Sequence, residues 1–212
     1  FGLMPSTVIG LTGGIACGKS TVTELLKTLG ATIVDADAIV RQLQQKGSPV
    51  LQEIATAFGP SVLTTDGELD RKGLGAIIFS DPDARQKLNG IMHPKVLDEM
   101  ASQTAVAKAS GAPVIVLDVP LLYESCRDAG ANPQARYGVE SVIVVSVDPE
   151  VQLARLMARD GSDAEAAGKR IAAQMPVAEK RGLADHIIDN GGSREETEGQ
   201  VRALWQKWTA SL

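Results

Sequence analysis

The residues best placed to do chemistry lie in one glycine-rich stretch near the start of the chain, VIGLTGGIACGKST (residues 8–21). Four of them have the spacing G-x-x-x-x-G-K-[ST] of a phosphate-binding P-loop: Gly13, Gly18, Lys19 and Ser20. Glycines let backbone N–H groups approach a phosphate chain closely, and the helix that follows adds the positive end of its dipole. We expect Lys19 to reach the terminal phosphates of a nucleotide and the Ser20 hydroxyl to hold Mg²⁺. An apolar run before the loop and an amphipathic one after it disfavour the alternative, a chance glycine-rich turn.

Three carboxylates that follow apolar segments are candidate partners of that loop. Asp35 and Asp37 come directly after residues 32–34, and Asp118 ends the segment VIVLD. Phosphoryl transfer depends on positioning and charge neutralisation, so we expect Asp37 to orient the acceptor hydroxyl or act as general base. Asp35 is expected in the outer shell of the metal, and Asp118 resembles a Walker-B acid that acts on Mg²⁺ through water. The alternatives are that Asp35 or Asp37 caps the next helix, or that Asp118 caps a turn.

Two arginines further along the chain are candidates for contact with the phosphates. Arg155 and Arg159 are four residues apart, so they share one face of a predicted helix, and Arg170 lies beyond the turn that follows. On a mobile helical hairpin these side chains would close over the nucleotide and exclude water. The alternative is a solvated basic face, which is the usual role of such a run.

A further set of basic residues in the middle of the chain would suit an anionic acceptor. Arg71, Lys87 and Lys95 bring positive charge there, and His93 precedes Pro94, where a helix would start. Each basic residue taken alone is more often a solvated surface group. A metal role for His93 is disfavoured because no partner ligand accompanies it, so we expect it to contact substrate.

Short apolar segments alternate with helical ones, and this alternation predicts what positions the candidate residues. The expected strands are residues 7–12, 32–34, 114–117, 142–147 and 187–188. The expected helices around them are residues 19–29, 38–45, 49–58, 150–158 and 164–174, a short one from 176, and a last one that Ser193 and Glu196 cap. The pattern predicts an α/β fold, a five-stranded parallel sheet flanked by helices. Its ligand crevice would lie at the carboxyl ends of the strands.

Two segments break this alternation. Residues 61–111 are mostly helical, and His93-Pro94 is expected to end one helix and begin another. This length exceeds a simple crossover, so we interpret residues 62–110 as an inserted helical substrate-binding region. Residues 123–138 are rich in turn-forming residues and are expected to form a polar loop.

Composition restricts the classes of partner. The chain has 212 residues, of which 44% are hydrophobic, enough for one domain with a real core, and no apolar run approaches the ~20 residues that cross a membrane. A net charge of −5 without a long basic run, and only 3% aromatic residues, argue against nucleic acid as a partner. No signal peptide is visible, and we expect Met4 to be the natural start of a monomeric, cytoplasmic protein.

The two cysteines, Cys17 and Cys126, have the spacing of neither a metal site nor a disulfide framework, and free thiols fit a reducing cytosol. Cys17 stands at a helix start beside Lys19, and both features favour the thiolate, so an oxidation-sensitive thiol is one hypothesis. The alternative, which we favour, is a small residue tolerated at a variable loop position.

Taken together, these segments resemble the dephospho-coenzyme A kinase family. The resemblance covers nearly the whole chain and includes, in order, IGLTGGIACGKST, VDADAIVRQL, LDRKGLGAIIF, LNGIMHPKV, LDVPLLYE, VQLARLMARDG and RIAAQMPVAEKRGLADHIIDNGG. The first segment alone indicates only a nucleotide, whereas the DAD, IMHP, DVPLLYE and DNGG segments in this order are far more specific. The chain departs from the family's usual Gly-Ser or Gly-Ala at Ala16 and Cys17, and its loop at 124–138 looks longer.

The resemblance implies a single P-loop kinase domain over residues 4–212, with a coenzyme-A-binding insertion at 62–110 and a lid at 155–175. The implied reaction transfers the γ-phosphoryl of ATP, with Mg²⁺, to the ribose 3′-hydroxyl of dephospho-coenzyme A, the last step of coenzyme A biosynthesis. The implied catalytic residues are Lys19, Asp37, Asp35 and Arg159. The implied acceptor-binding residues are Asp37, Arg71, His93, Leu121 and Leu122. The implied ATP-binding residues are Gly13, Gly14, Ile15, Ala16, Cys17, Gly18, Lys19, Ser20, Thr21, Arg155, Asn190 and Gly191.

Two other functions would fit the loop alone. One is another small-molecule P-loop kinase, such as one for nucleoside monophosphates, and the IMHP and DVPLLYE segments argue against it. The other is a nucleotide-dependent switch without acceptor chemistry, which the Asp35–Asp37 pair and the lid arginines disfavour.

Overall fold

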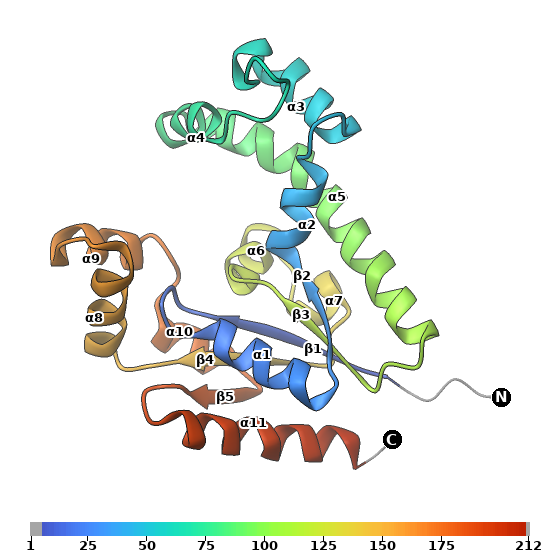
Figure 1. Ribbon diagram of the computed structural model, residues 1–212, viewed down its shortest axis with the longest axis vertical. Coiled ribbons are helices and arrows are strands. Elements are labelled where there is room, and N and C mark those ends of the chain that lie inside the picture. Colours follow the sequence, from blue (N-terminus) through green and yellow to red (C-terminus); the bar gives the residue numbers. More distant parts are fainter. Residues whose placement is uncertain (1–5, 211–212) are drawn as a thin grey trace. The chain divides into compact units, whose positions relative to one another are not determined.

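The computed structural model describes residues 6–210 (Figure 1). The expected start at Met4 and the expected domain limits at 4 and 212 lie outside the described residues. The strands are β1 (Thr7–Gly13), β2 (Thr32–Asp35), β3 (Val114–Asp118), β4 (Ser141–Ser146) and β5 (His186–Asp189). The helices are α1 (Lys19–Leu29), α2 (Ala36–Leu43), α3 (Pro49–Phe58), the 3₁₀ turn η1 (Pro60–Val62), α4 (Arg71–Ser80), α5 (Pro82–Ala109), α6 (Leu122–Asp128), α7 (Pro133–Tyr137), α8 (Pro149–Asp160), α9 (Ala164–Ala172), α10 (Val177–Leu183) and α11 (Arg194–Thr209).

The five strands form one parallel sheet in the order β2-β3-β1-β4-β5, so the predicted α/β fold is confirmed. The register pairs Leu11 of β1 with Asp118 of β3, and Gly13 of β1 with Val145 of β4. The loop after β1 therefore leaves the sheet beside the carboxyl ends of both neighbouring strands. This edge of a parallel sheet is where ligands bind in open α/β folds.

The central strands are apolar almost throughout because helices cover both faces of the sheet. On one face α1 and α11 pack against each other and against the strands, and Val22, Leu26 and Trp208 belong to the shared core (Figure 1). On the other face α6 contacts β1, and α7 and α10 contact β4. Several helices start or end at residues that cap them. They are Gly30 after α1, Ser48 before α3, Asp70 before α4, and before α11 the Ser193–Glu196 capping box, which was predicted.

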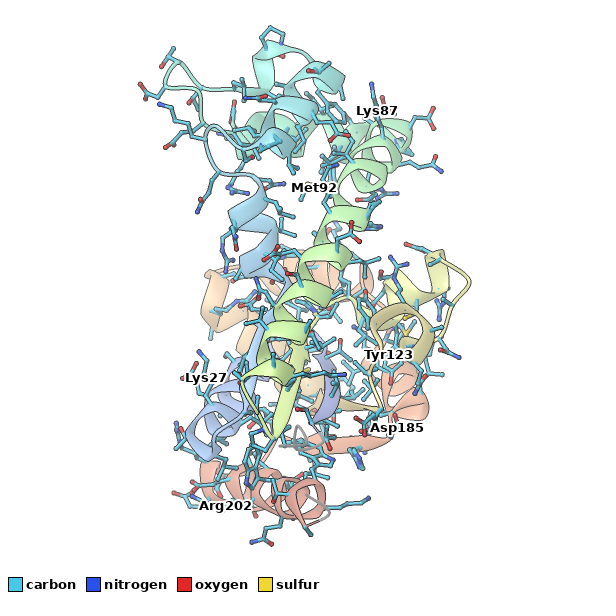
Figure 2. The ribbon with its side chains drawn as sticks, turned by 90° about the vertical axis from the view of Figure 1, so that its right-hand side faces the viewer. Lys27, Lys87, Met92, Tyr123, Asp185 and Arg202 are labelled. Carbon is cyan, nitrogen blue, oxygen red and sulfur yellow. The ribbon has the colours of Figure 1, made fainter. Side chains whose placement is uncertain are left out.

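The chain divides into two compact units, which we describe separately. The nucleotide unit comprises the residues up to Val34 and from Gln103 onward, and the helical unit comprises Asp35–Ser102. The helical unit has its own aliphatic core, in which Ile54, Leu74 and Met92 are buried (Met92 is labelled on α5 in Figure 2). Since α2 and α3 contribute to this core, the compact unit begins earlier in the chain than the insertion predicted at 62–110.

The prediction that His93-Pro94 separates two helices is wrong. The single helix α5 runs from Pro82 to Ala109 with Pro94 inside it. A proline in a helix interior removes one hydrogen bond and crowds the preceding turn. Leu88 and Met92 before the proline and Val96 after it pack in the same aliphatic cluster, which favours a continuous helix despite that cost.

The prediction of a polar loop at 123–138 is also wrong, because most of these residues form α6 and α7. Leu122, Tyr123 and Cys126 bury one face of α6 (Tyr123 is labelled in Figure 2), and the Tyr123 hydroxyl donates a hydrogen bond to the Leu183 carbonyl at 2.9 Å. The Asn132 side chain caps α7. Burial of an apolar face in so short a helix is difficult to recognise from a turn-rich sequence. Among residues 6–210, no helix is long and apolar enough to cross a membrane.

Candidate active site

The loop between β1 and α1 has the geometry of an anion-binding site. β1 ends at Gly13, and α1 begins at Lys19 with Gly18 as its N-cap residue. No side chain caps this helix start, and its first turn carries no acidic residue. Backbone N–H groups and the positive end of the helix dipole therefore remain available at this terminus, an arrangement that suits a phosphate chain.

Close contacts require glycine at several positions of the loop, including Gly14 and Gly18. Gly18 has a φ of 81°, and a Cβ there would overlap Nδ2 of Asn190. A Cβ on Gly14 would overlap the Val177 side chain. Among the described residues, Ala16 alone of the non-glycine residues has a positive φ, at 60°, so its methyl group is held in a disfavoured backbone conformation.

Lys19 forms an ion pair with Asp118 at the end of β3. Oδ2 of the buried Asp118 also accepts a hydrogen bond from Oγ1 of Thr23 on α1, at 3.1 Å. These contacts satisfy the carboxylate and hold the lysine beside the loop. The structure therefore brings Lys19 and Asp118 together, and the Asp118 carboxylate contacts side chains of α1.

Ser20 and Asp118 are the residues of this unit that would hold Mg²⁺. Magnesium uses oxygen ligands and often takes one or two from the protein, with phosphates and water supplying the rest. Ser20 presents an exposed hydroxyl in the first turn of α1, and Asp118 contacts the same helix through Lys19 and Thr23. Since both Asp118 oxygens are already engaged, this donor set fits an ion that the acid touches through water. Residues 6–210 contain no cluster of three or more His, Cys, Asp or Glu that could hold a metal by itself.

Two glutamines hold the backbone of Ile15 from opposite sides. Gln152 of α8 donates from Nε2 to the Ile15 carbonyl at 2.9 Å, and the Ile15 N–H donates to Oε1 of Gln174 at 3.0 Å. Both backbone groups of this loop residue are thus fixed by side chains. Sequence reasoning missed Gln152 and gave Gln174 only as the end of a helix, because a single glutamine in a helical segment carries no local signal.

Asn190 supports the loop from the side of β5. It is buried, its Nδ2 donates to the Cys17 carbonyl at 2.9 Å, and its Oδ1 accepts from Oγ1 of Thr197 at 2.9 Å. The amide group is therefore engaged by the loop and by α11. Gly191, the next residue, is exposed.

The predicted lid residues lie on the helical pair α8 and α9. Nη1 of Arg155 lies 3.9 Å from the position that a Cβ on Gly18 would take, so this arginine reaches the P-loop. Arg159 instead donates from Nε to Asp160 Oδ1 at 2.8 Å, and Arg170 also pairs with Asp160. The hydrogen bond from Arg159 lowers the pKa of Asp160 below its usual value. In this structure Arg155 is near the loop, and Arg159 is engaged within its own hairpin.

The hypothesis of a reactive Cys17 thiolate is not supported by its surroundings. Cys17 is fully buried in the core beneath the loop, and this burial raises the pKa of the thiol above its ordinary value. Hydrogen bonds from the Gly14 and Val147 backbone and the charges of Lys180 and Arg155 oppose that shift with smaller effect. The burial agrees with the alternative of a small residue packed below the loop.

The two candidate acids in the helical unit have different surroundings. Asp35 is the N-cap of α2, where its Oδ1 accepts the Ala38 N–H at 2.9 Å. Asp37 is exposed in the first turn of the same helix. Capping, one of the two roles considered for these acids, is therefore the one that Asp35 adopts.

The basic candidates of the helical unit have partners within that unit. Nη1 of the exposed Arg71 donates to Oε1 of Gln44 at 2.6 Å, and Lys95 pairs with Glu53 at 3.0 Å. Lys87, which is labelled in Figure 2, donates to the Ala57 carbonyl at 2.8 Å. His93 is partly buried within α5.

The segment between β3 and α6 presents one of its two candidate leucines to solvent. Leu121 is 46% exposed, whereas Leu122 is fully buried against β1, where its Cδ1 lies 3.0 Å from the position of a Cβ on Gly10. Leu121 is thus the residue of the pair that an acceptor could contact directly.

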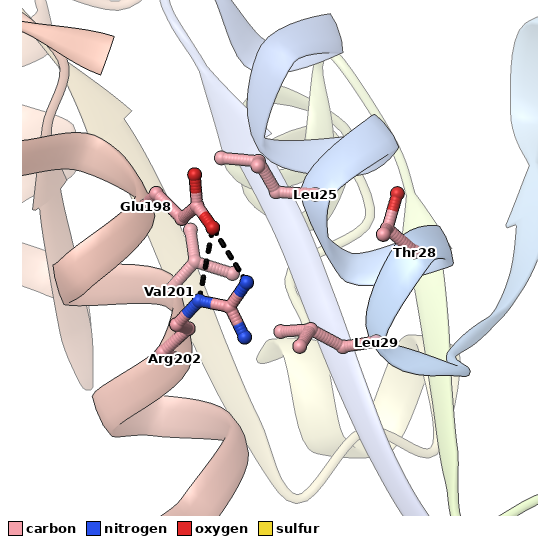
Figure 3. A pocket seen from close by; sticks show the side chains of 6 residues that line it. All are labelled: Leu25, Thr28, Leu29, Glu198, Val201 and Arg202. Carbon is pink, nitrogen blue, oxygen red and sulfur yellow. Dashed lines mark hydrogen bonds and ion pairs between the residues drawn. The ribbon is translucent and has the colours of Figure 1, made fainter. Parts of the chain in front are cut away.

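The small cavity of the nucleotide unit shown in Figure 3 lies away from the loop. It measures about 20 Å³ and is lined by the end of α1 and by α11, where Glu198 and Arg202 form an ion pair (Figure 3). A space of this size holds about one water molecule. It is therefore too small for a nucleotide, and the P-loop remains the candidate site.

Comparison with known proteins identifies the family. The family model described as dephospho-CoA kinase matches residues 7–196. A dephospho-CoA kinase of Symbiobacterium thermophilum is 51% identical over 199 residues, covering 94% of this chain and 80% of that protein. Another, of Geobacillus kaustophilus, is 45% identical over 202 residues, covering 95% and 96% of the two chains.

Solved structures agree with the sequence comparison. A crystal structure from Thermus thermophilus has a TM-score of 0.80 at 31% identity and covers 96% of this chain and 98% of its own. A dephospho-CoA kinase from Campylobacter jejuni has a TM-score of 0.65 at 27% identity, covering 97% and 98%. The chain therefore belongs to the dephospho-CoA kinase family, enzymes that use ATP to phosphorylate dephospho-CoA in the last step of coenzyme A biosynthesis.

Proposed function

We propose that the residues of this chain divide the transfer between a donor side, the residues that bind ATP at the P-loop, and an acceptor side, the residues that bind dephospho-CoA. The reaction moves the γ-phosphoryl of ATP to the ribose 3′-hydroxyl of dephospho-CoA and leaves ADP. The observation that carries the proposal is the uncapped start of α1 beside the Lys19–Asp118 pair, in a chain of this family.

On the donor side, the loop N–H groups and Lys19 bind the ATP phosphates and neutralise charge that builds up during transfer. ATP contacts the loop residues from Gly13 to Thr21, with Arg155 at the loop and Gly191 beyond β5. When ATP arrives, its phosphates compete with Asp118 for the Lys19 ammonium. Asp118 would then keep the lysine near the phosphates.

Magnesium supplies a positive charge that neutralises the ATP phosphates. Ser20 would hold the ion directly and Asp118 through water, because its carboxylate is engaged by Lys19 and Thr23. Asp35 is the weaker candidate for the outer shell, since it caps α2.

On the acceptor side, Asp37 orients the 3′-hydroxyl and accepts its proton during transfer. Its exposed carboxylate in the first turn of α2 supports this role over that of Asp35. Arg71, His93 and Leu121 contact the acceptor. The buried Leu122 shapes the segment between β3 and α6 that carries Leu121. Residues 62–110 provide most of this acceptor-binding region.

Residues 155–175 act as a lid in this proposal. Arg155, which reaches the P-loop, would bind phosphate, and Arg159 would exchange its Asp160 partner for the transferring phosphoryl group. Such an exchange has a low cost because both partners are solvent-exposed.

We further propose that the protein is a monomer and that it acts in the cytoplasm, a reducing compartment that suits the free cysteines Cys17 and Cys126. Sedimentation at micromolar concentration tests the monomer.

The test of the proposed function is an assay of purified protein with ATP, Mg²⁺ and dephospho-CoA. ADP release is followed by a coupled reaction, and the product's 3′-phosphate is located by mass spectrometry. We expect turnover with dephospho-CoA and none with nucleoside monophosphates. Turnover with another acceptor alone would favour a different small-molecule kinase, and tight ATP binding without any product would favour a nucleotide switch.

A further inference from the structure

Lys180 of α10 is the largest of the fully buried side chains, with 0% exposure, and the site described above does not use it. Its Nζ lies 3.2 Å from the Gly13 carbonyl, 3.3 Å from the Pro120 carbonyl and 2.9 Å from Oε1 of Glu124. An ammonium has three donors, so the three acceptors match its full capacity. The charge is thus completely satisfied inside the nucleotide unit.

Stability alone gives little reason for this arrangement. A buried ion pair often contributes no more than apolar side chains of similar volume, because desolvation offsets the attraction between the charges. The pair here is also incompletely satisfied, since Oε2 of Glu124 is buried without a hydrogen-bond partner in the described part of the chain. An unpaired buried oxygen is unfavourable. The contacts of Lys180 therefore call for a role other than stabilisation.

The acceptors of Lys180 belong to segments that the transfer needs in a fixed relation. Gly13 is the first residue of the P-loop, and Pro120 follows Asp118, the partner of Lys19, by two residues. The Pro120 carbonyl also accepts from Oγ1 of Thr12 at 2.9 Å. Lys180 thus joins the loop that binds ATP to the segment that continues from β3.

Glu124 extends this connection toward the proposed lid. Its Oε1 accepts the Met175 N–H at 3.0 Å as well as the Lys180 ammonium. The residue before Met175 is Gln174, which holds the Ile15 N–H. The end of the lid region, the loop and the start of α6 are therefore connected through the ion pair of the buried Lys180 and the partly buried Glu124.

We propose that Lys180 is a positioning residue for phosphoryl transfer, with Glu124 as its counter-ion. Its ammonium fixes the Gly13 and Pro120 carbonyls, and so sets the P-loop backbone relative to Asp118 and Leu121. The proposal rests on the proposed function for its effect on turnover, but its effect on ATP affinity does not depend on the acceptor.

The experiment compares Lys180→Met, Glu124→Gln and the double variant with the unaltered protein. For each, the folded fraction is measured by denaturant unfolding, the Kd for ATP by calorimetry, and kcat and KM with dephospho-CoA. Lys180→Met should lose stability because it leaves the Glu124 carboxylate without its cation. The double variant removes both charges and should regain most of that stability.

The deciding result is the kinetics of the double variant at equal folded fraction. We expect kcat to stay about 100-fold low and the ATP Kd to rise about tenfold, since small displacements of positioning groups have effects of this order. Lys180→Arg, which keeps charge and donors, should exceed Lys180→Met in kcat/KM for ATP. Lys27→Met removes an exposed lysine of α1 and should leave every value unchanged.

A double variant with recovered stability and unaltered kcat and ATP Kd would overturn the proposal, since Lys180 would then be structural only. If no Lys180 variant folds, the ATP Kd of Glu124→Gln is the deciding measurement. Weaker ATP binding by this variant would support the positioning role of Lys180, and unchanged binding would contradict it. If the unaltered protein makes no coenzyme A yet the variants still weaken ATP binding, the proposed function fails and the positioning role stands.

Discussion

The nucleotide unit and the helical unit hold their candidate residues by different means. In the nucleotide unit, side chains of α8, of α10 and of the residue after β5 form hydrogen bonds with backbone groups of the P-loop at Gly13, Ile15 and Cys17. In the helical unit, an aliphatic cluster sets the helices, and Asp37 is an exposed residue at a helix start. Under the proposed assignment, the donor residues would depend on individual hydrogen bonds to the loop, whereas the acceptor residues of the helical unit would depend on the packing of its aliphatic cluster.

Asp37→Asn is the variant expected to separate most clearly an effect on turnover from an effect on ATP binding. The substitution keeps the shape of the side chain but removes the base, so kcat should fall by about 10²–10⁴. The ATP Kd should stay within about twofold, because Lys19 and the loop are unaltered. Steady-state kinetics and calorimetry measure the two quantities.

The matched control is Asp35→Asn, two residues away. Asn is a good N-cap residue, so α2 should keep its stability and kcat should fall much less than with Asp37→Asn. A larger loss from Asp35→Asn would exchange the roles of the two acids. A fall confined to ATP affinity in Asp37→Asn would assign Asp37 to the metal.

Local signals in the sequence predict much of the fold but not the contacts between distant residues. The sheet, the strand ends and most helix starts follow from local signals, such as the apolar runs, Gly30, Asp70 and the Ser193–Glu196 pair. The P-loop glycines and Lys19 are likewise read from spacing alone. The side chains that hold the loop could not be predicted from spacing, because Gln152 and Lys180 are more than 130 residues from the loop in sequence.

The failures have a common physical cause in tertiary packing. Pro94 looks like a helix boundary, yet packing of the buried Met92 and the partly buried Val96 in one aliphatic cluster favours a continuous α5. The less favoured hypothesis of a Cys17 thiolate rested on a helix start and Lys19, yet burial in the core has the larger effect on the thiol pKa. In each case, burial decided against a local signal that was itself correctly recognised.

Gly18→Ala tests the atomic precision of the donor side. The methyl group would overlap the Asn190 amide, and φ of 81° is unfavourable for alanine. We expect a loss of about 3 kcal/mol in unfolding free energy from strain and displacement of Asn190. The ATP affinity of this variant should also fall, and calorimetry on the folded protein measures it.

The control is Gly199→Ala on α11, where a Cβ meets no neighbour within 4 Å. Alanine is the better helix former, so this variant should be about 1 kcal/mol more stable. Equal ATP affinity in Gly18→Ala and the unaltered protein would contradict the tight fit described for the loop.

Met92→Ala makes the corresponding test in the helical unit. Met92 is buried in the aliphatic cluster, so its truncation should cost about 2–3 kcal/mol of unfolding free energy. KM for dephospho-CoA should rise while ATP affinity is retained. Met92→Leu, which nearly conserves volume, should cost less than about 1.5 kcal/mol. A loss of ATP affinity in Met92→Ala would contradict this comparison, because a change in the helical unit would then also affect ATP binding.

The smallest effect is expected at Ala16, where the loop backbone is strained. Its φ of 60° costs about 1 kcal/mol for a residue with a Cβ, and glycine relieves it. Ala16→Gly should therefore raise the denaturant midpoint slightly, although glycine usually destabilises by increasing the entropy of the unfolded chain. Ala203→Gly, at an exposed position of α11, provides the matched control and should lower the midpoint by a similar amount. Opposite signs for the same substitution would show that the loop backbone is held in its strained form by its neighbours. A lower midpoint for Ala16→Gly would show that the loop relaxes when ATP is absent.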